Sequence, residues 1–521
     1  MNAAGESRAA GAARLAGWAV AAAGLAYLAA CVRGPVNVHD EGYSAYCAGR
    51  MAAGDLPFRD FYTIYSPGAF YLEAGVFWLL GTKLIFLRGL DLCVRAALVL
   101  AAGLGARAAG AGRWAALPMA LACLYLGPMG FFGYALLPGL VLALLSVLSW
   151  ARHLDQGRPA WAAASGALAG LAAVCRQDLG FYIGAAVFAG SAVVLWLEPE
   201  GRGRRLAGLG VFAAAAAATA AAALAQCLWA VGPRFIWDQL VGVALSGRLG
   251  NLALPLPSLL HPFRNLGAWL RHGSRGDLEP FRIWLALYLS LALLGLGLLR
   301  SLAGLALGVG RSAQLRRLLL LALLGLCFVR QGLNRADLIH FMPLLLLSWV
   351  QLAALLATGV RRLPLLAAAG VLLAAFGAVG VSDWARAAGP RAGEREAACE
   401  RAAGLPLPAD LDQAIELVRQ GTRPGDRIFV ADEDLTQPQN YNLLFYFLAD
   451  RADVDSMEFG EGGVPFSQDV LRALKDPATR AFVLWRGGYG AQKLGPDVQA
   501  QIAAFAPLAA TVGDYDIRIR R

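Results

Sequence analysis

Two adjacent carboxylates follow the first apolar run of the sequence. They are Asp40 and Glu41, in the string His39-Asp40-Glu41-Gly42-Tyr43. Where a membrane helix meets water, partial loss of hydration raises the pKa of a carboxyl group. Such a group can take a proton from a hydroxyl nucleophile or bind a divalent cation. On the dipeptide alone, a solvated loop with helix-capping acids is the favoured interpretation.

Charged residues interrupt the apolar sequence at two later points. The first cluster contains Arg176, Gln177 and Asp178, and the second contains Arg330, Arg335, Asp337 and His340. Charges at a membrane boundary are costly unless they pair or bind something polar. Arginine can hold a phosphate through two parallel hydrogen bonds, and histidine adds an acid or base near neutral pH. The alternative is that arginine and aspartate pair within each cluster and anchor helix ends.

Membrane helices must position these residues. The chain has 521 residues, of which 58% are hydrophobic and 16% are charged, and its mean hydropathy is +0.54. Apolar runs of about 18 residues recur, and each is long enough to span a hydrocarbon core. This composition excludes a large soluble helical protein. We predict about eleven spans, which cover approximately residues 15–32, 88–106, 114–130, 134–150, 160–175, 179–197, 206–231, 282–299, 318–330, 341–357 and 363–381.

The charges of the loops predict the topology. Arg8 and Arg14 precede the first apolar run, so the positive-inside rule places the N-terminus in the cytoplasm. Basic residues then recur in every second loop, provided that the short apolar stretch 68–80 is not counted as a span. We therefore predict that 68–80 is a juxtamembrane or re-entrant helix. The segments predicted to lie outside, in the periplasm, include 34–87, 176–178, 232–281 and 330–340.

The sequence changes character after Ser382. Residues 1–382 carry 30 basic and 15 acidic side chains, whereas residues 383–521 carry 16 and 21, so the net charges are +15 and −5. Short strands are predicted at 427–430 and 481–485, and helices at 411–419 and 469–474. We predict a transmembrane domain over 1–382 and a small periplasmic α/β domain over 383–521. The basic residues punctuate apolar spans, which predicts contact with membrane lipids and no nucleic-acid partner.

The eight cysteines mostly lie in or beside apolar spans and have no paired spacing. This pattern predicts small buried hydrophobic residues, not a disulfide or zinc framework. The string Leu28-Ala29-Ala30-Cys31 is similar to a lipoprotein processing box. A first transmembrane helix that ends in small residues gives the same string, so lipidation of Cys31 stays open.

Residues 15 to about 110 resemble the first periplasmic loop and its flanking helices in the GT-C superfamily of integral membrane glycosyltransferases. The resemblance is to family 39-like members, relatives of protein O-mannosyltransferases and lipid A aminoarabinose transferases. It rests on Asp40-Glu41, on Tyr43, on the turn GDLPFRDF at 54–61 and on Tyr65-Ser66-Pro67. The resemblance implies a GT-C-like helical fold and a polyprenyl-phosphate sugar donor. It also implies that Asp40 is the catalytic base, that Glu41 supports it, and that Arg59 and Tyr65 bind substrate.

The sequence departs from this family pattern at two places. Members often carry a lysine before the proline, thought to grip the lipid phosphate, and here that residue is Ser66. Members often carry a second acid in the next periplasmic turn, and here the turn at 134–138 has none. Another cation must then hold the phosphate. The candidates for substrate binding are Arg176, Asp178, Arg330, Arg335, Asp337 and His340.

The expected function is transfer of a sugar to a hydroxyl acceptor on the periplasmic face of a bacterial inner membrane. The acceptor is an envelope glycan, a lipid or a protein. No metal-ligand cluster stands out, although Asp40 and Glu41 are compatible with a divalent cation. The alternative is a transporter or flippase of a lipid-linked or anionic solute. Transport needs polar groups near the bilayer midplane, whereas the unusual charges here gather at one boundary.

Overall fold

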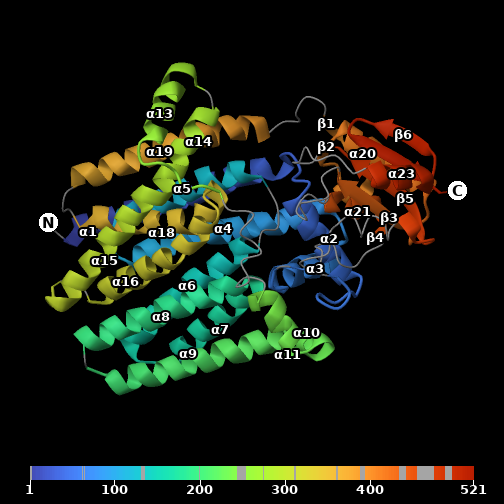
Figure 1. Cartoon of the computed structure of the whole chain (residues 1–521). Coiled ribbons are helices and arrows are strands. Elements are labelled where there is room, and N and C mark those ends of the chain that lie inside the picture. Colours follow the sequence, from blue (N-terminus) through green and yellow to red (C-terminus); the bar gives the residue numbers. More distant parts are fainter. Residues whose placement is uncertain are drawn as a thin grey trace.

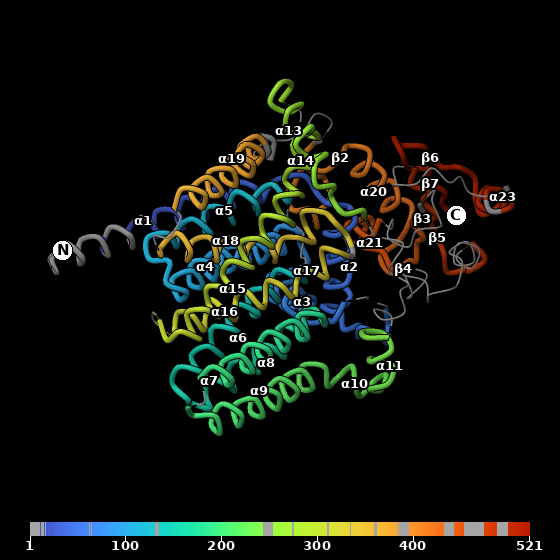
Figure 2. Tube along the Cα trace, turned by 60° about the vertical axis from the view of Figure 1, so that its left-hand side comes forward, coloured from blue at the N-terminus to red at the C-terminus, as the bar shows by residue number. Residues whose placement is uncertain are grey.

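The computed structural model describes residues 3–61, 63, 65–130, 135–198, 200–242, 254–273, 275–309, 312–358, 362–387, 394–432, 442–453, 474–486 and 496–520. These residues form a bundle of long, roughly parallel helices and an α/β domain stacked on one end of it (Figure 1). We call that end of the bundle the domain end. The N-terminus lies at the other end, as a second view also shows (Figure 2).

The helical part covers every region predicted to span the membrane. Its principal helices are α1 (Ala3–Ala30), α2 (Asp40–Ala52), α3 (Gly68–Leu80), α4 (Leu84–Ala108), α5 (Ala116–Leu126), α6 (Leu136–Gln156), α7 (Pro159–Cys175), α8 (Gln177–Leu197), α9 (Arg202–Ala223), α10 (Ala225–Val231), α11 (Pro233–Trp237), α13 (His261–His272), α14 (Arg275–Trp284), α15 (Ser290–Ala306), α16 (Ser312–Cys327), α17 (Val329–Asn334), α18 (Leu338–Ala357) and α19 (Arg362–Ala387). The predicted helix at 68–80 is therefore confirmed as α3. The last long helix, α19, continues past Ser382 to Ala387.

Seven described helices are long and apolar enough to cross a membrane, which makes the chain a multi-pass membrane protein. Three shorter apolar helices add to them: Gly17–Arg33, Gly68–Leu80 and Pro159–Cys175. The helix α4 also runs through the bundle, but it carries Arg88, Asp91 and Arg95. All three side chains are buried, so they meet protein and not lipid.

Charged side chains tie several helices together at the end of the bundle away from the domain. Asp155, at the end of α6, lies 2.5 Å from Arg317 and 3.3 Å from Arg316, both on α16. Arg316 also lies 3.6 Å from Glu198, which follows α8, and Arg205 on α9 lies 3.3 Å from the same carboxylate. Residues of three predicted cytoplasmic loops thus meet at one end of the bundle, as the predicted alternation requires, and the side of the membrane that this end faces stays a prediction.

The α/β domain is built on a five-stranded mixed sheet. The strand order is β4-β3-β5-β7-β6, with β3 parallel to β4 and β5 and with β7 antiparallel to β5 and β6. The strands are β3 (Arg427–Asp432), β4 (Ala452–Asp453), β5 (Thr479–Trp485), β6 (Leu508–Val512) and β7 (Tyr515–Ile519). A short antiparallel pair, β1 (Glu394–Glu396) and β2 (Pro406–Pro408), precedes it.

Three helices complete the domain: α20 (Ala409–Gly421), α21 (Leu443–Ala449) and α23 (Pro496–Phe505). The strands predicted at 427–430 and 481–485 and the helix at 411–419 are therefore confirmed. The helix predicted at 469–474 lies almost entirely outside the described residues. The sequence analysis did not predict β6 and β7. Strand β6 has little alternation between buried and exposed residues, whereas β7 alternates, with Tyr515 and Ile517 buried.

The domain packs directly on α2 and α3, the elements that follow the first span (Figures 1 and 2). Helix α2 lies so close to α21 that a Cβ atom at Gly42 would sit 2.5 Å from the backbone nitrogen of Leu444. Aromatic rings cross the same interface, with Phe77 stacked on Phe447 at 5.6 Å. The first loop and the domain therefore share one apolar core.

Candidate active site

Asp40 is the first residue of α2 and its side chain is exposed. The Asn37 side chain stabilises this helix start, because its carbonyl oxygen accepts hydrogen bonds of 3.0 Å from the backbone N–H groups of His39 and Asp40. The Asn37 amide nitrogen donates a 3.2 Å hydrogen bond to Asp40 Oδ2. A helix N-terminus favours a negative charge. Asp40 is thus an accessible carboxylate with a fixed backbone.

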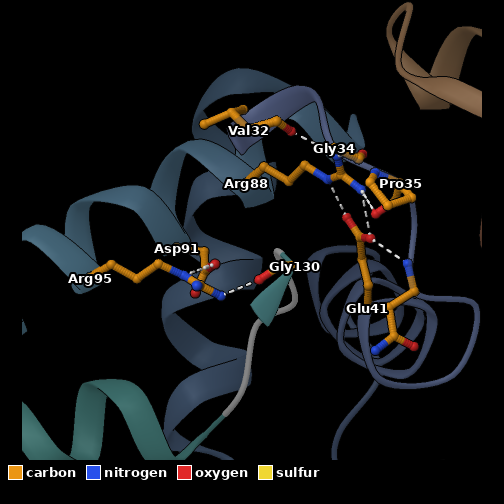
Figure 3. Close-up of polar contacts among 9 residues, drawn as sticks. Val32, Gly34, Pro35, Glu41, Arg88, Asp91, Arg95 and Gly130 are labelled. Carbon is orange, nitrogen blue, oxygen red and sulfur yellow. Dashed lines mark hydrogen bonds and ion pairs between the residues drawn. The ribbon is translucent and has the colours of Figure 1, made fainter. Parts of the chain in front are cut away.

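Glu41 points the other way, into the protein, where it is fully buried against Arg88 (Figure 3). The Arg88 Nε and Nη2 atoms donate to the two Glu41 oxygens at 2.5 and 2.8 Å. The other three guanidinium N–H groups donate to the carbonyl oxygens of Val32, Gly34 and Pro35, at 2.7, 2.7 and 3.3 Å. All five donors of the side chain are used. Arg88 therefore locks α2 and the preceding turn onto α4.

A second buried pair lies on the same face of α4. Arg95 Nε donates to Asp91 Oδ2 at 2.8 Å, and Arg95 Nη2 donates to the carbonyl oxygen of Gly130 (Figure 3). The other terminal nitrogen donates to the carbonyl oxygen of Leu126. The spacing of Arg88, Asp91 and Arg95 alone is typical of an ion-pair ladder along one helix. The structure forms the Asp91–Arg95 rung, but Arg88 pairs with Glu41 instead.

Helix α2 has a further attachment, to α3. The Ser44 hydroxyl donates a 2.6 Å hydrogen bond to Glu73 Oε2, and both side chains are buried. Ser44 lies one helical turn after Asp40 and three residues after Glu41. Two buried polar contacts, to α3 and to α4, thus hold the first turns of α2 and so fix the direction of Asp40.

The turn after α2 holds the predicted substrate-binding residue Arg59, whose side chain is half exposed. It forms a two-pronged contact with Asp60, with distances of 2.9 and 2.7 Å. Asp60 also accepts a 2.7 Å hydrogen bond from the Leu56 N–H. The Arg59 hydrogen bond, together with that from Leu56, holds the pKa of the Asp60 carboxyl below its usual range. The turn is well organised, but Arg59 already has a partner.

Tyr65 is partly buried and connects α2 to the next segment. Its ring meets the edge of Tyr43 at 6.2 Å, and the Tyr43 hydroxyl lies 2.8 Å from Thr63 Oγ1. The next residue, Ser66, lies against the break between α7 and α8. Its backbone and side chain both approach Gln177 Oε1, at 3.4 Å. The structure therefore places the 176–178 cluster beside the position where the family pattern has its lysine.

The Arg176–Asp178 cluster forms an internal ion pair. Arg176 Nε lies 2.9 Å from Asp178 Oδ1, and both side chains are only partly exposed. This is the pairing that the alternative interpretation predicted. Both side chains keep part of their surface exposed, so substrate binding by Arg176 and Asp178 stays a prediction.

Arg330 lies close to this cluster in space. The Tyr182 ring of α8 packs edge-on against Phe328, two residues before Arg330, with 5.1 Å between the ring centroids. Arg330 is exposed and makes no hydrogen bond or ion pair within the part of the chain that the structure describes. It is therefore an available cation at the domain end.

The remaining three candidates form a compact cap on α18. Asp337 accepts a 2.8 Å hydrogen bond from the His340 N–H, and its carboxylate lies 2.7 Å from His340 Nδ1 and 2.9 Å from Arg335 Nε. Burial alone raises the pKa of Asp337, but the contacts with His340 and the Arg335 charge outweigh it, so the pKa lies below its usual value. The geometry is that of a helix N-cap. Substrate binding by these residues stays a prediction.

One contact to the site had no signal in the sequence. The His39 ring lies 5.6 Å from the Trp485 ring, at the end of β5, and Trp485 stacks on Tyr515 at 6.3 Å. The carboxyl end of a parallel strand thus reaches the residue before Asp40. Cys31 is buried, and no three His, Cys, Asp or Glu side chains in the described ranges form a group that could hold a metal ion.

The sequence matches no protein-family model and no curated protein. The fold is similar to that of ArnT from Cupriavidus metallidurans bound to undecaprenyl phosphate, with a TM-score of 0.59 and 14% identity over 96% of this chain and 97% of that one. The chain has the fold of the GT-C membrane glycosyltransferases. It is also similar to the Archaeoglobus fulgidus oligosaccharyltransferase, in the complex with zinc and sulfate, with a TM-score of 0.52 and 12% identity over 89% of this chain and 68% of that one. At these identities the similarity concerns the fold.

Proposed function

We propose that this GT-C protein transfers a sugar from a polyprenyl-phosphate donor to a hydroxyl acceptor, with its chemistry at the domain end of the bundle. One observation carries the proposal. An exposed carboxylate, Asp40, is held by a clamped helix at the same end of the bundle as Arg330, an exposed arginine with no ion pair among the residues that the structure describes. The ArnT structure with a similar fold contains undecaprenyl phosphate, which supports a lipid-phosphate donor. We further propose that the domain end faces the periplasm of a bacterial inner membrane.

In this mechanism Asp40 accepts the proton of the acceptor hydroxyl, whose oxygen attacks the anomeric carbon of the sugar. The bond between that carbon and the phosphate oxygen breaks, and the polyprenyl phosphate leaves with the electron pair. Arg330, with Arg176 beside it, donates hydrogen bonds to the phosphate as its charge develops. Attack in line with the departing phosphate inverts the anomeric centre.

The buried residues around Asp40 have positioning roles in this mechanism. Glu41 cannot reach a substrate, because it is fully buried and both oxygens accept hydrogen bonds from Arg88. It supports Asp40 by fixing α2. The charge network at the other end of the bundle supports catalysis over transport, because alternating access would have to break the contacts of Asp155 and Glu198.

The test uses membranes that contain the full-length chain, incubated with labelled polyprenyl-phosphate sugars. We expect label to leave the lipid and appear in a hydroxyl acceptor. Asp40→Asn should lower that transfer by about a hundredfold or more, the scale of losing a general base, without lowering the unfolding temperature. The matched control is Asp238→Asn, which alters an exposed acid whose side chain is 61% accessible.

Two outcomes contradict the proposal. Near-normal transfer by Asp40→Asn would place the base elsewhere. Movement of labelled lipid across the bilayer without any transfer would indicate a flippase instead.

A further inference from the structure

Helix α13 has two chemically distinct faces. At 3.6 residues per turn, its apolar side chains occupy roughly a third of the circumference, a typical amphipathic stripe. These residues are Pro262, Phe263, Leu266, Trp269 and Leu270. The other face carries His261, Arg264, Asn265, Arg271 and His272. Every ionisable side chain of α13 is therefore basic or a histidine.

Only part of the apolar stripe is used to pack α13 on the protein. Phe263 meets Phe281 and Trp284 of α14 at 5.9 and 5.0 Å, and Leu266 and Trp269 pack against the core of the bundle. Leu270 remains 70% exposed and Phe263 46% exposed. The segment that leads into α13 exposes four more leucines: Leu254, Leu256, Leu259 and Leu260.

This apolar surface projects from the flank of the helical bundle. Both views show α13 standing out beside α14 and α19, away from the bundle axis (Figures 1 and 2). In a multi-pass membrane protein the flank of the bundle meets lipid. Six exposed large apolar side chains on one short segment are costly in water and favourable among acyl chains.

The charges select the kind of lipid. Arg264 and Arg271 are exposed, and neither forms an ion pair with any acid among the described residues. The neighbouring helix carries Asp277 and Glu279, and neither of these pairs with the α13 arginines. A basic face above an inserted apolar face matches the boundary between acidic headgroups and acyl chains.

We propose that α13 and residues 254–260 lie in the membrane interface and bind anionic phospholipid. Phe263, Leu270 and the four leucines insert among the acyl chains, and Arg264 and Arg271 contact the headgroup phosphates. The surface thereby fixes the depth of the α13–α14 hairpin in the bilayer. This inference is independent of the proposed sugar transfer.

The experiment uses the full chain in nanodiscs of phosphatidylcholine, with or without phosphatidylglycerol. A spin label is attached at Leu270→Cys or at Arg264→Cys, in a background with Cys93→Ala and Cys327→Ala, the two cysteines that are not buried. We expect the label at 270 to collide more with oxygen than with a water-soluble nickel chelate, and the label at 264 to show the reverse. With phosphatidylglycerol present the label at 270 should become deeper and less mobile.

The double variant Arg264→Gln/Arg271→Gln should abolish that response to phosphatidylglycerol. Each arginine near an anionic surface contributes about a fivefold change in lipid preference. The matched control, Arg423→Gln/Arg480→Gln, removes two exposed arginines from the α/β domain and should leave the response intact. A label at 270 that collides mainly with the nickel chelate in both bilayers would overturn membrane insertion. A label at 270 that ignores phosphatidylglycerol in the unaltered helix would overturn anionic-lipid binding.

Discussion

Replacement of Arg88 should destabilise the fold more than replacement of any exposed arginine. Arg88→Met leaves the Glu41 carboxylate fully buried, with the Asn37 N–H at 3.0 Å as its remaining contact. An uncompensated buried charge costs about 3–5 kcal/mol. Three backbone carbonyls also lose their donor, at about 1 kcal/mol each. The sum, about 6–8 kcal/mol, is comparable with the whole stability of many proteins.

A milder change separates charge from geometry. Arg88→Lys keeps the positive charge, but an ammonium has three donors where the guanidinium has five. At least two of the five hydrogen bonds are lost, which should cost about 2–3 kcal/mol. The assay is thermal unfolding of the purified protein in detergent, followed by tryptophan fluorescence. The control is Arg59→Met, whose side chain is 53% exposed and should contribute less than about 1 kcal/mol.

The double variant Glu41→Leu/Arg88→Met tests whether the two side chains act as a pair. Removing both charges avoids the buried unpaired carboxylate, so the double variant should be more stable than Arg88→Met alone. We expect a coupling energy of about 2 kcal/mol or more between the two positions. Strictly additive effects, or a normal unfolding temperature for Arg88→Met, would refute the claim that Arg88 clamps α2.

Three further predictions follow from the site and its supports. Arg330→Ala should raise the KM for the lipid donor about tenfold or more, because a bidentate contact with the phosphate is lost. Arg330→Lys should recover only part of that loss, because lysine keeps the charge without the guanidinium fork. Unchanged donor KM in Arg330→Ala would leave the phosphate site unidentified. Gly42→Ala places a methyl group against the α21 backbone. The α/β domain should therefore separate from the bundle and become more sensitive to limited proteolysis. The control Gly17→Ala, where the added methyl group meets open space, should leave the proteolysis pattern unchanged. Asp337 has a lowered pKa in the folded state, so its stabilisation is present above the ordinary carboxyl pKa and is lost as the pH falls below about 4. Asp337→Asn keeps a capping side chain but removes the charge beside Arg335 and His340, so it should lower the unfolding free energy by up to about 1 kcal/mol at neutral pH. The gap from the unaltered protein should close at acid pH, as unfolding curves across that range will show.

The domain contact changes how the first loop is understood. From sequence, residues 33 to about 67 are a polar segment that follows a membrane span. In the structure this segment contains α2, whose buried face is shared with the α/β domain. The residue before Asp40 meets Trp485, more than 400 positions later in the chain. A domain far away in sequence therefore helps to set the direction of the candidate base.

The sequence by itself determined most of the membrane helices, the grouping of basic loops and two strands of the tail, β3 and β5. Those features depend on composition within one segment: apolar length, loop charge, and a short run of buried residues. It also indicated Asp40 and Glu41 through their place after the first span. Local chemistry of this kind is readable because neighbouring residues share one element.

Tertiary structure alone decided which partner each charged side chain takes. Arg88 has Asp91 one helical turn away, yet it pairs with Glu41, because α2 and the turn before it together bring five acceptors to one guanidinium. Ser44 meets Glu73, and Ser66 meets Gln177, 111 residues apart in the sequence. Such contacts depend on how whole helices pack, and no periodicity within a segment encodes them.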